Sequence, residues 1–469
     1  MREKINAQTE IDFQPSTLKL TNAYYAKYES ISSILGENPS IVDAVHRDLK
    51  KPLKYATVKG QDGRPHRFTS DQVLRILLCQ IIEGSSLREI VIRIDDSNFL
   101  RRFTGIYNGP MMDFTTLDKL KNSIPSATWK KVNQILGQHA VRKDLITGEK
   151  VRLDTTAVET NVHYPTDSTL LWDTCRVLAR LIRQARELDR GAVGDQRLHP
   201  RRVKRLAQEI GRKAGKEKAA AELKPLYNDL IGRVEAISEW AGKVRQELLQ
   251  RSKSGRYGLL DDAMAQALAQ ELEHYIELGR KVIDQAQRRV LGGEAVPNDQ
   301  KLFSIFEPHT ELLIRGKAGK PVEFGHMIQI QQVRQKFITD YEAFVKKPVE
   351  HQLLTPAIES HRELFGQYPK EVSGDKGYYE SLAALQKLGQ KVKLVSIAKK
   401  GARTQEETER EHDPAFRHAQ RFRAGVEGSI SFLKRVLGLL RCFNKGWNHF
   451  AATVGATVFS HNLLILARA

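Results

Sequence analysis

The chain has 469 residues, 41% of them hydrophobic, so it can hold two to four domains with real cores, and global disorder is excluded. Lysine and arginine total 75 against 56 acidic residues, a formal charge of +19, which favours nucleic acid as a partner over an unremarkable basic protein. The three cysteines form no CxxC pair, which excludes a zinc ribbon of that kind and a disulfide framework.

The apolar stretches give no sign of a membrane protein. Residues 1–14 mix charged and polar side chains and lack the apolar core of a signal peptide. The stretch 451–467 contains His461 and Asn462 and is slightly short for a membrane span, so we expect a buried helix there. The expected location is the cytoplasm.

Residues 1–145 are predicted to form a helical domain that binds DNA or mediates dimerisation. Thr69, Ser70 and Asp71 offer N-caps for an apolar helix, and the Gly-Ser-Ser run at 84–86 breaks it before the next helix. This pattern is compatible with a helix-turn-helix, but any helical bundle shows it, so DNA contact and plain packing both stay open. Helices are expected at 16–35, 73–83, 87–94 and 126–139, and one more is capped by the threonines at 115–116.

The sequence changes character at Val151, where β-branched residues at 151–158 predict a strand. A long block with helical apolar spacing follows, from about Leu170 to Leu291. Beyond it, strands are predicted at 303–306, 324–333, 336–344, 371–374 and 391–397, and helices at 355–365, 379–388, 413–440 and 447–466. This alternation predicts a mixed α/β fold, in the element order of the ribonuclease-H-like fold.

Three carboxylates are candidates for chemistry. Asp154 lies on the first strand, Asp375 follows a short strand between two glycines, and Glu427 shares a helical face with Arg423 and, nearly two turns on, Lys434. Taken singly, Asp154 is better explained as a strand-end cap and Glu427 as part of a surface salt bridge, while Asp375 is balanced between a ligand site and a turn. Carboxylates that converge on Mg²⁺ would together make a phosphoryl-transfer site.

Taken jointly, these motifs resemble those of DDE transposases of bacterial insertion sequences, near the group labelled ISNCY. Residues 151–156 (VRLDTT) are similar to the strand with the first aspartate, and 374–378 (GDKGY) to the segment with the second. Arg423, Glu427 and Lys434 resemble the third motif, although Gln420 stands where a tyrosine is expected. The segments 160–168 and 304–310 also resemble this group, and the resemblance extends from about residue 70 onward.

The resemblance implies a ribonuclease-H-like core and an enzyme that is both an endonuclease and a strand transferase. Water would release a 3′-hydroxyl at the transposon end, and that hydroxyl would attack target DNA in the same site. The residues that would be catalytic and would bind two Mg²⁺ ions, or Mn²⁺ in their place, are Asp154, Asp375 and Glu427.

The family also implies the partners of the chain. These are double-stranded DNA, as terminal inverted repeats and as target, and a second copy in a homodimer on DNA, in the nucleoid and away from membranes. The residues that would hold DNA phosphates are Arg423, Lys434 and Lys376. Two rivals stay open: a ribonuclease-H-like nuclease or resolvase without strand transfer, and a non-catalytic basic DNA-binding protein.

The large gap in this chain separates the two aspartates. We therefore expect a catalytic domain of residues 146–168 and 294–469, interrupted after its first strand by a helical insertion at 169–293. Residues 176–218 hold 14 Lys and Arg against 5 Asp and Glu. Such an arm can follow the DNA backbone without reading sequence, and it is equally explained as a solvated coiled-coil hairpin.

Overall fold

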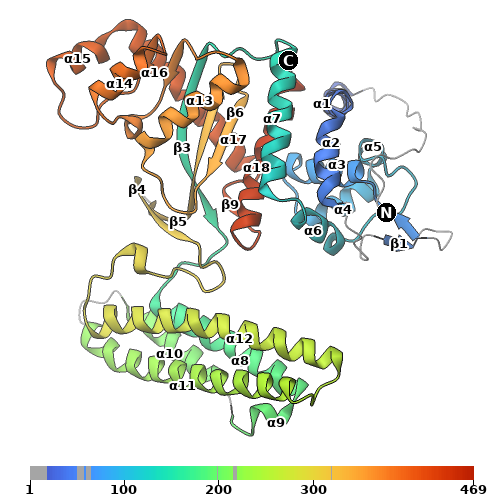
Figure 1. Cartoon of the computed structure of the whole chain (residues 1–469), viewed down its shortest axis with the longest axis vertical. Helices are drawn as coiled ribbons and strands as arrows, with labels where there is room; N and C mark the ends of the chain where they lie inside the picture. Colours follow the sequence, from blue (N-terminus) through green and yellow to red (C-terminus); the bar gives the residue numbers. More distant parts are fainter. Residues whose placement is uncertain are drawn as a thin grey trace. The chain divides into compact units, whose positions relative to one another are not determined.

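The computed structural model describes residues 18–49, 57–59, 65–197, 199–214, 219–317 and 320–468 (Figure 1). The chain divides into two compact units, which are described separately: unit 1 is Met1–Thr160 with Gly325–Ala469, and unit 2 is Asn161–Phe324. The insertion thus takes in more of the chain than the predicted 169–293.

Unit 1 begins with a helical region whose helix starts follow from local capping. Thr69 and Gln72 form a capping box at the start of α3, and Ser86 and Glu89 form another at α4. The helix predicted to be capped by Thr115 is instead capped by Asp113, whose carboxylate accepts the Thr115 N–H. The helices are α1 (Lys19–Glu37), α2 (Pro39–Leu49), α3 (Ser70–Ile82), α4 (Leu87–Asp96), α5 (Asn98–Phe103), α6 (Phe114–Asn122) and α7 (Ser126–Arg142), with a hairpin of β1 (Thr57–Lys59) and β2 (Pro65–Arg67).

The helix-turn-helix question bears on α3 and α4. Helix α3 is buried along most of its length, as expected of a packing helix. The exposed positions of α4 mix both charges: Arg88 and Arg93 stand beside Glu89, Asp95 and Asp96. Because a helix that enters the major groove approaches dense negative charge, this mixed face favours plain helical packing.

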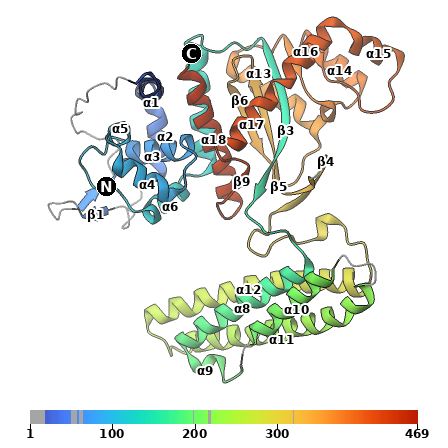
Figure 2. The same cartoon turned by 180° about the vertical axis from the view of Figure 1, so that it is seen from behind.

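The last helix, α18 (Trp447–Leu466), joins this helical region to the rest of unit 1. It packs along α7 (Figure 2) and also contacts α1, α3 and β6. By length and composition it is the one described helix that could cross a membrane, but 78% of its most apolar window is buried within the protein. The predicted buried helix is confirmed, and the N-terminal helices share one hydrophobic core with it rather than forming a separate one.

The rest of unit 1 is built on a mixed sheet of seven strands. One of the seven, β4, belongs by its residue numbers to unit 2 and pairs with β5. Strand β3 is central: it pairs antiparallel with β5 on one side and parallel with β7 on the other, and β8 adds parallel to β7. Strand β6 pairs antiparallel with β5, and β9 pairs parallel with the end of β3. The strands are β3 (Lys150–Thr160), β4 (Glu311–Lys317), β5 (Lys320–Val333), β6 (Ile338–Ala343), β7 (Glu371–Ser373), β8 (Leu394–Ser396) and β9 (Arg441–Cys442).

Burial along β3 explains its central place. Ten consecutive residues of this strand, from Val151 to Thr160, are buried, as expected of a strand covered on both faces. Helices α16 and α17 pack against β3, and α16 also covers β7 and β8, while α13 and α18 pack against β6. The helices of this region are α13 (Leu354–Phe365), α14 (Leu382–Gly389), α15 (Gln405–His412), α16 (Pro414–Ala424) and α17 (Val426–Arg435), with short 3₁₀ turns at Glu350–Leu353 and Lys376–Tyr378.

Unit 2 is a helical bundle with its own hydrophobic core. Its helices are α8 (Asp167–Leu188), α9 (Arg190–Val193), α10 (Pro200–Lys213), α11 (Ala219–Lys253) and α12 (Leu259–Ala286), which ends in a π-helical turn at Gln287–Leu291, and a 3₁₀ turn follows at Asn298–Gln300. Helices α8, α11 and α12 pack on one another, and α10 packs on α8 and α11.

Two predicted elements are wrong. Residues 303–306 form no strand, because the Ser304 hydroxyl accepts the backbone N–H groups of Phe306 and Glu307 and turns the chain. The strand that pairs here is β4, eight residues later. The single helix predicted at 413–440 is instead α16 and α17, which part at Gly425.

Candidate functional site

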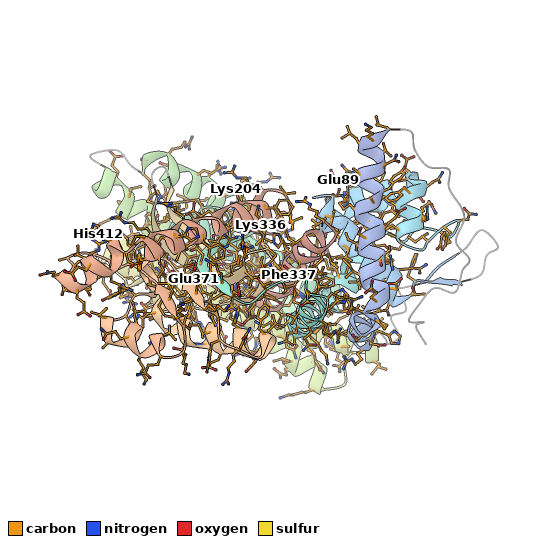
Figure 3. The ribbon with its side chains drawn as sticks, turned by 90° about the horizontal axis from the view of Figure 1, so that it is seen from above. Glu89, Lys204, Lys336, Phe337, Glu371 and His412 are labelled. Carbon is orange, nitrogen blue, oxygen red and sulfur yellow. The ribbon has the colours of Figure 1, made fainter. Side chains whose placement is uncertain are left out.

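The two aspartates meet where two parallel strands separate. Strands β3 and β7 stay in register up to Arg152 and Ser373, and the same register continued would set Asp154 opposite Asp375. After Ser373 the chain turns toward β8, where the Gly374 N–H bonds to the Ser396 carbonyl. Ligands of open α/β sheets gather at such carboxyl ends of strands. Figure 3 labels Glu371, which marks the start of β7.

Asp154 is buried, and its surroundings oppose its ionisation. Burial and, next, the Asp375 carboxylate raise its pKa to about 6, with a smaller contribution from Glu427. The Arg423 guanidinium and the Thr155 N–H act in the opposite direction, the latter donating to Asp154 Oδ1 over 2.8 Å. The charges of both other predicted acids therefore raise the pKa of Asp154. With a pKa of about 6, Asp154 is still mostly ionised at neutral pH.

Asp375 closes a tight turn. Its Oδ1 accepts the N–H of Gly377 over 2.9 Å, so it caps the 3₁₀ turn that follows. A Cβ at Gly377 would lie 1.6 Å from Glu350 Oε2 and 3.1 Å from Asp375 Oδ1, so only glycine admits the Glu350 carboxylate here. The two carboxylate oxygens lie within about 5 Å of each other, close enough for mutual repulsion.

Glu350 is thus a fourth carboxylate beside the predicted three. It starts the 3₁₀ turn before α13 and accepts a hydrogen bond from the Thr155 hydroxyl. Beneath these acids lies Tyr378, which is fully buried and whose hydroxyl accepts a hydrogen bond from Gln329 over 3.1 Å. Burial raises the pKa of Tyr378 well above its ordinary value, and the surrounding carboxylates raise it further.

Glu427 lies in the first turn of α17 and is largely exposed. Arg423 connects it to the first aspartate: Nη1 is 3.6 Å from Asp154 Oδ2, and Nη2 is 3.4 Å from Glu427 Oε1. The i,i+4 pair survives the break between α16 and α17, so Arg423 stands as a cation between two of the three predicted acids.

The two lysines predicted to contact DNA phosphates differ in their exposure to solvent. Lys376 is exposed beside Asp375, and Lys434 is half-buried in the last turn of α17. Gln420, at the position where a tyrosine was expected, donates to the Ser396 carbonyl over 2.7 Å and to the Gly374 carbonyl over 3.3 Å. It therefore ties α16 to the strand ends that carry Asp375.

The donor set suits a hard divalent cation by its chemistry. Asp154 and Asp375 are adjacent oxygen donors that repel each other, and a divalent ion would relieve that repulsion. Within the described part of the chain, no three His, Cys, Asp or Glu side chains are arranged as a ready coordination shell. Glu427 stands on the far side of Arg423, which already neutralises part of the acidic charge.

No protein-family model matches this chain, and no curated protein or solved structure matches it either.

Proposed function

We propose that this chain is a DNA transposase that cuts and joins DNA at Asp154, Asp375 and Glu427. The observation that carries the proposal is the adjacency of the two aspartates at the point where β3 and β7 separate, with Arg423 joining Asp154 to Glu427. Asp154 thus interacts electrostatically with two acids that lie 221 and 273 positions later in the sequence.

The strand arrangement supports a ribonuclease-H-like core. Within the seven-stranded sheet, β6, β5 and β3 are antiparallel neighbours and β3, β7 and β8 are parallel neighbours, while β4 pairs with β5 and β9 with the end of β3; this mixed arrangement is compatible with that fold. The proposed fold would have the first acid on the central strand and the second acid just after the strand that runs parallel to it. Asp154 lies on the central strand β3, and Asp375 follows its parallel neighbour β7.

Mg²⁺ or Mn²⁺ bound by the three carboxylates would polarise the scissile phosphate and activate the attacking oxygen. The protein's own part is to hold the acids in place and to limit the rise in the pKa of Asp154. Arg423 offsets part of the effect of burial on Asp154, Thr155 and Gly377 hold Asp154 and Asp375 through backbone N–H groups, and Gln420 fixes the strand ends. The basic side chains proposed to contact DNA phosphates are Arg423, Lys434 and Lys376.

The test compares D375N with wild type on DNA duplexes taken from the sequence that flanks the coding region, with Mg²⁺ or Mn²⁺. Wild type should cut the strand and join the new 3′-hydroxyl to target DNA, whereas D375N should bind the same duplex and cut at least 100-fold more slowly. E380Q is a matched control, because Glu380 is exposed and lies five positions away.

Each result separates the rival functions. If wild type cuts the DNA but does not join it to target DNA, the protein is a nuclease or resolvase and not a transposase. Binding without any cutting by wild type would leave a basic DNA-binding protein. Cutting by D375N at the wild-type rate would refute the site itself.

A further inference from the structure

Unit 2 carries its charge unevenly. Helices α10 and α12 each pack on α8 and α11, and α10 and α12 make little contact with each other, so they lie on opposite sides of the α8–α11 pair. Helix α10 has six Lys and Arg residues against one Glu. Helix α12 has six Asp and Glu residues against two basic ones. The bundle is therefore basic on one side and acidic on the other.

The basic side is a single stripe. The buried residues of α10 are Val203, Ala207 and Ile210, which face the core. On the opposite face lie Arg201, Lys204, Arg205, Gln208 and Arg212, all exposed and all within about 50° of one line along the helix at 100° per residue. This set is called the α10 face, and Lys204 marks it in Figure 3.

The cations of this stripe are not used to stabilise the fold. Lys213 pairs with Glu209 and Glu222, and Arg202 lies 3.9 Å from Asp229, but these residues flank the stripe. Among the residues that the structure describes, Arg201, Lys204, Arg205 and Arg212 make no ion pair. Four adjacent like charges without counter-ions repel one another, a cost that an external polyanion would remove.

We propose that the α10 face binds the phosphate backbone of double-stranded DNA, as a contact separate from the carboxylate site. The choice of DNA among polyanions rests on the proposed function, whereas the surface itself rests on the charges. From Arg201 to Arg212 the stripe runs about 16 Å, the length of roughly five base pairs. Arginine and lysine on a smooth helix face neutralise phosphates without reading bases, so the contact is independent of sequence.

The acidic side of the bundle offers one other occupant, a second copy of the chain. The exposed acids of α12 include Asp261, Glu271 and Glu277, and they complement the α10 face in sign. Such a head-to-tail contact would join opposite sides of the bundle and would form open chains of molecules instead of a closed dimer. The whole chain carries a charge of +19, so DNA is favoured, because like-charged copies repel each other.

The experiment measures binding of the full-length protein to a 40-base-pair duplex of arbitrary sequence (about four helical turns), without divalent metal, over a range of salt concentrations. The variant R201Q/R205Q removes two charges from the α10 face. The control variant R280Q/K281Q removes the same charge from exposed positions of α12. Circular dichroism verifies that both variants fold, and light scattering follows their mass against concentration.

The α10 variant should lower the slope of log affinity against log salt by about two, since each lost phosphate contact removes about 0.9. The control should leave the slope unchanged. Equal slopes for wild type and the α10 variant, or an equal loss in both variants, would overturn the proposal. A mass that rises with concentration in wild type and not in the α10 variant, with DNA binding unchanged, would assign the face to a second copy.

The result is independent of the carboxylate site, because no metal is present and no strand is cut. If wild type fails to cut DNA but the slope falls in the α10 variant, the proposed transposase is refuted and the surface stands. If cutting and joining occur but the slope does not change, the transposase stands and the surface is refuted.

Discussion

Asp154 has an environment that favours its protonated form. With its pKa raised to about 6, the folded state holds this proton more tightly than the unfolded chain, whose aspartates titrate at 3.8. The resulting stability is complete below about pH 4 and is lost as the pH rises through about 6. At neutral pH the protein therefore carries an ionised carboxylate that its fold does not favour, as expected of a functional site.

We predict that D154N removes this dependence. Relative to wild type, the variant should gain about 2.5 kcal/mol in unfolding free energy between pH 4 and pH 7.5, which is most of the roughly 3 kcal/mol that a shift of about two pKa units represents. Urea denaturation at both pH values measures it, with E380Q as a control that should follow wild type. A constant difference between D154N and wild type across this range would contradict the placement of Asp154.

Sequence patterns singled out the three acids, but they gave no sign of Glu350 or of the contacts that Gln420 makes. Each acid lies in a short motif that resembles a transposase motif and that can be recognised from a few neighbouring residues. Glu350 acquires its place through Thr155, 195 positions away, and Gln420 through the ends of two strands. No local pattern signals such contacts, because they exist only once the sheet has formed. Whether the three acids bind metal stays a prediction.

At the scale of elements, Gly425 explains why α16 and α17 are separate. The ideal Cβ at this position would lie 2.3 Å from Arg152 Nη1. Arg152 cannot easily yield, because its side chain donates to Gln332 Oε1 and to the Phe422 carbonyl and stacks on the Phe422 ring. The sequence predicted one helix because a glycine inside a helical pattern costs only about 1 kcal/mol.

Two glycines three positions apart make a matched test of this explanation. G425A should destabilise the protein by about 1–3 kcal/mol, because the new methyl group meets a fixed guanidinium. G428A should be neutral or stabilising by up to about 1 kcal/mol, because Gly428 is helical and its Cβ would meet nothing within 4 Å. Chemical denaturation compares the two variants, and equal stability would mean that Arg152 does not enforce the break.

Other elements were predicted well where pattern and packing agree. Helix α18 has the predicted bounds 447–466, because a long apolar run has few alternatives to burial. Strand β3 was found from its β-branched residues. The strand predicted at 303–306 failed because Ser304 makes a local turn that composition does not show.

At the scale of the whole molecule, the cores of the two units are distinct clusters. We predict two thermal transitions in calorimetry. L272A, which empties a fully buried position of unit 2, should cost about 2–5 kcal/mol and lower one transition only. V454A, at a fully buried position of α18, should lower the other. A single transition that moves as a whole in both variants would show that the units unfold together.

The central strand has all its partners later in the chain: the part of β5 that pairs with it (residues 325–333) follows unit 2, and β7 and β9 are farther still. A ribosome adds about 5 to 20 residues per second, so roughly 10 to 30 s pass between synthesis of β3 and of the first strand that can pair with it. Unit 2, built from helices with mostly near neighbours, can fold in that interval. Meanwhile β3 remains an unpaired edge, open to association with other nascent chains. Placing the insertion after the first strand thus makes the carboxylate site the last part of this region to form and gives β3 a long exposure during synthesis.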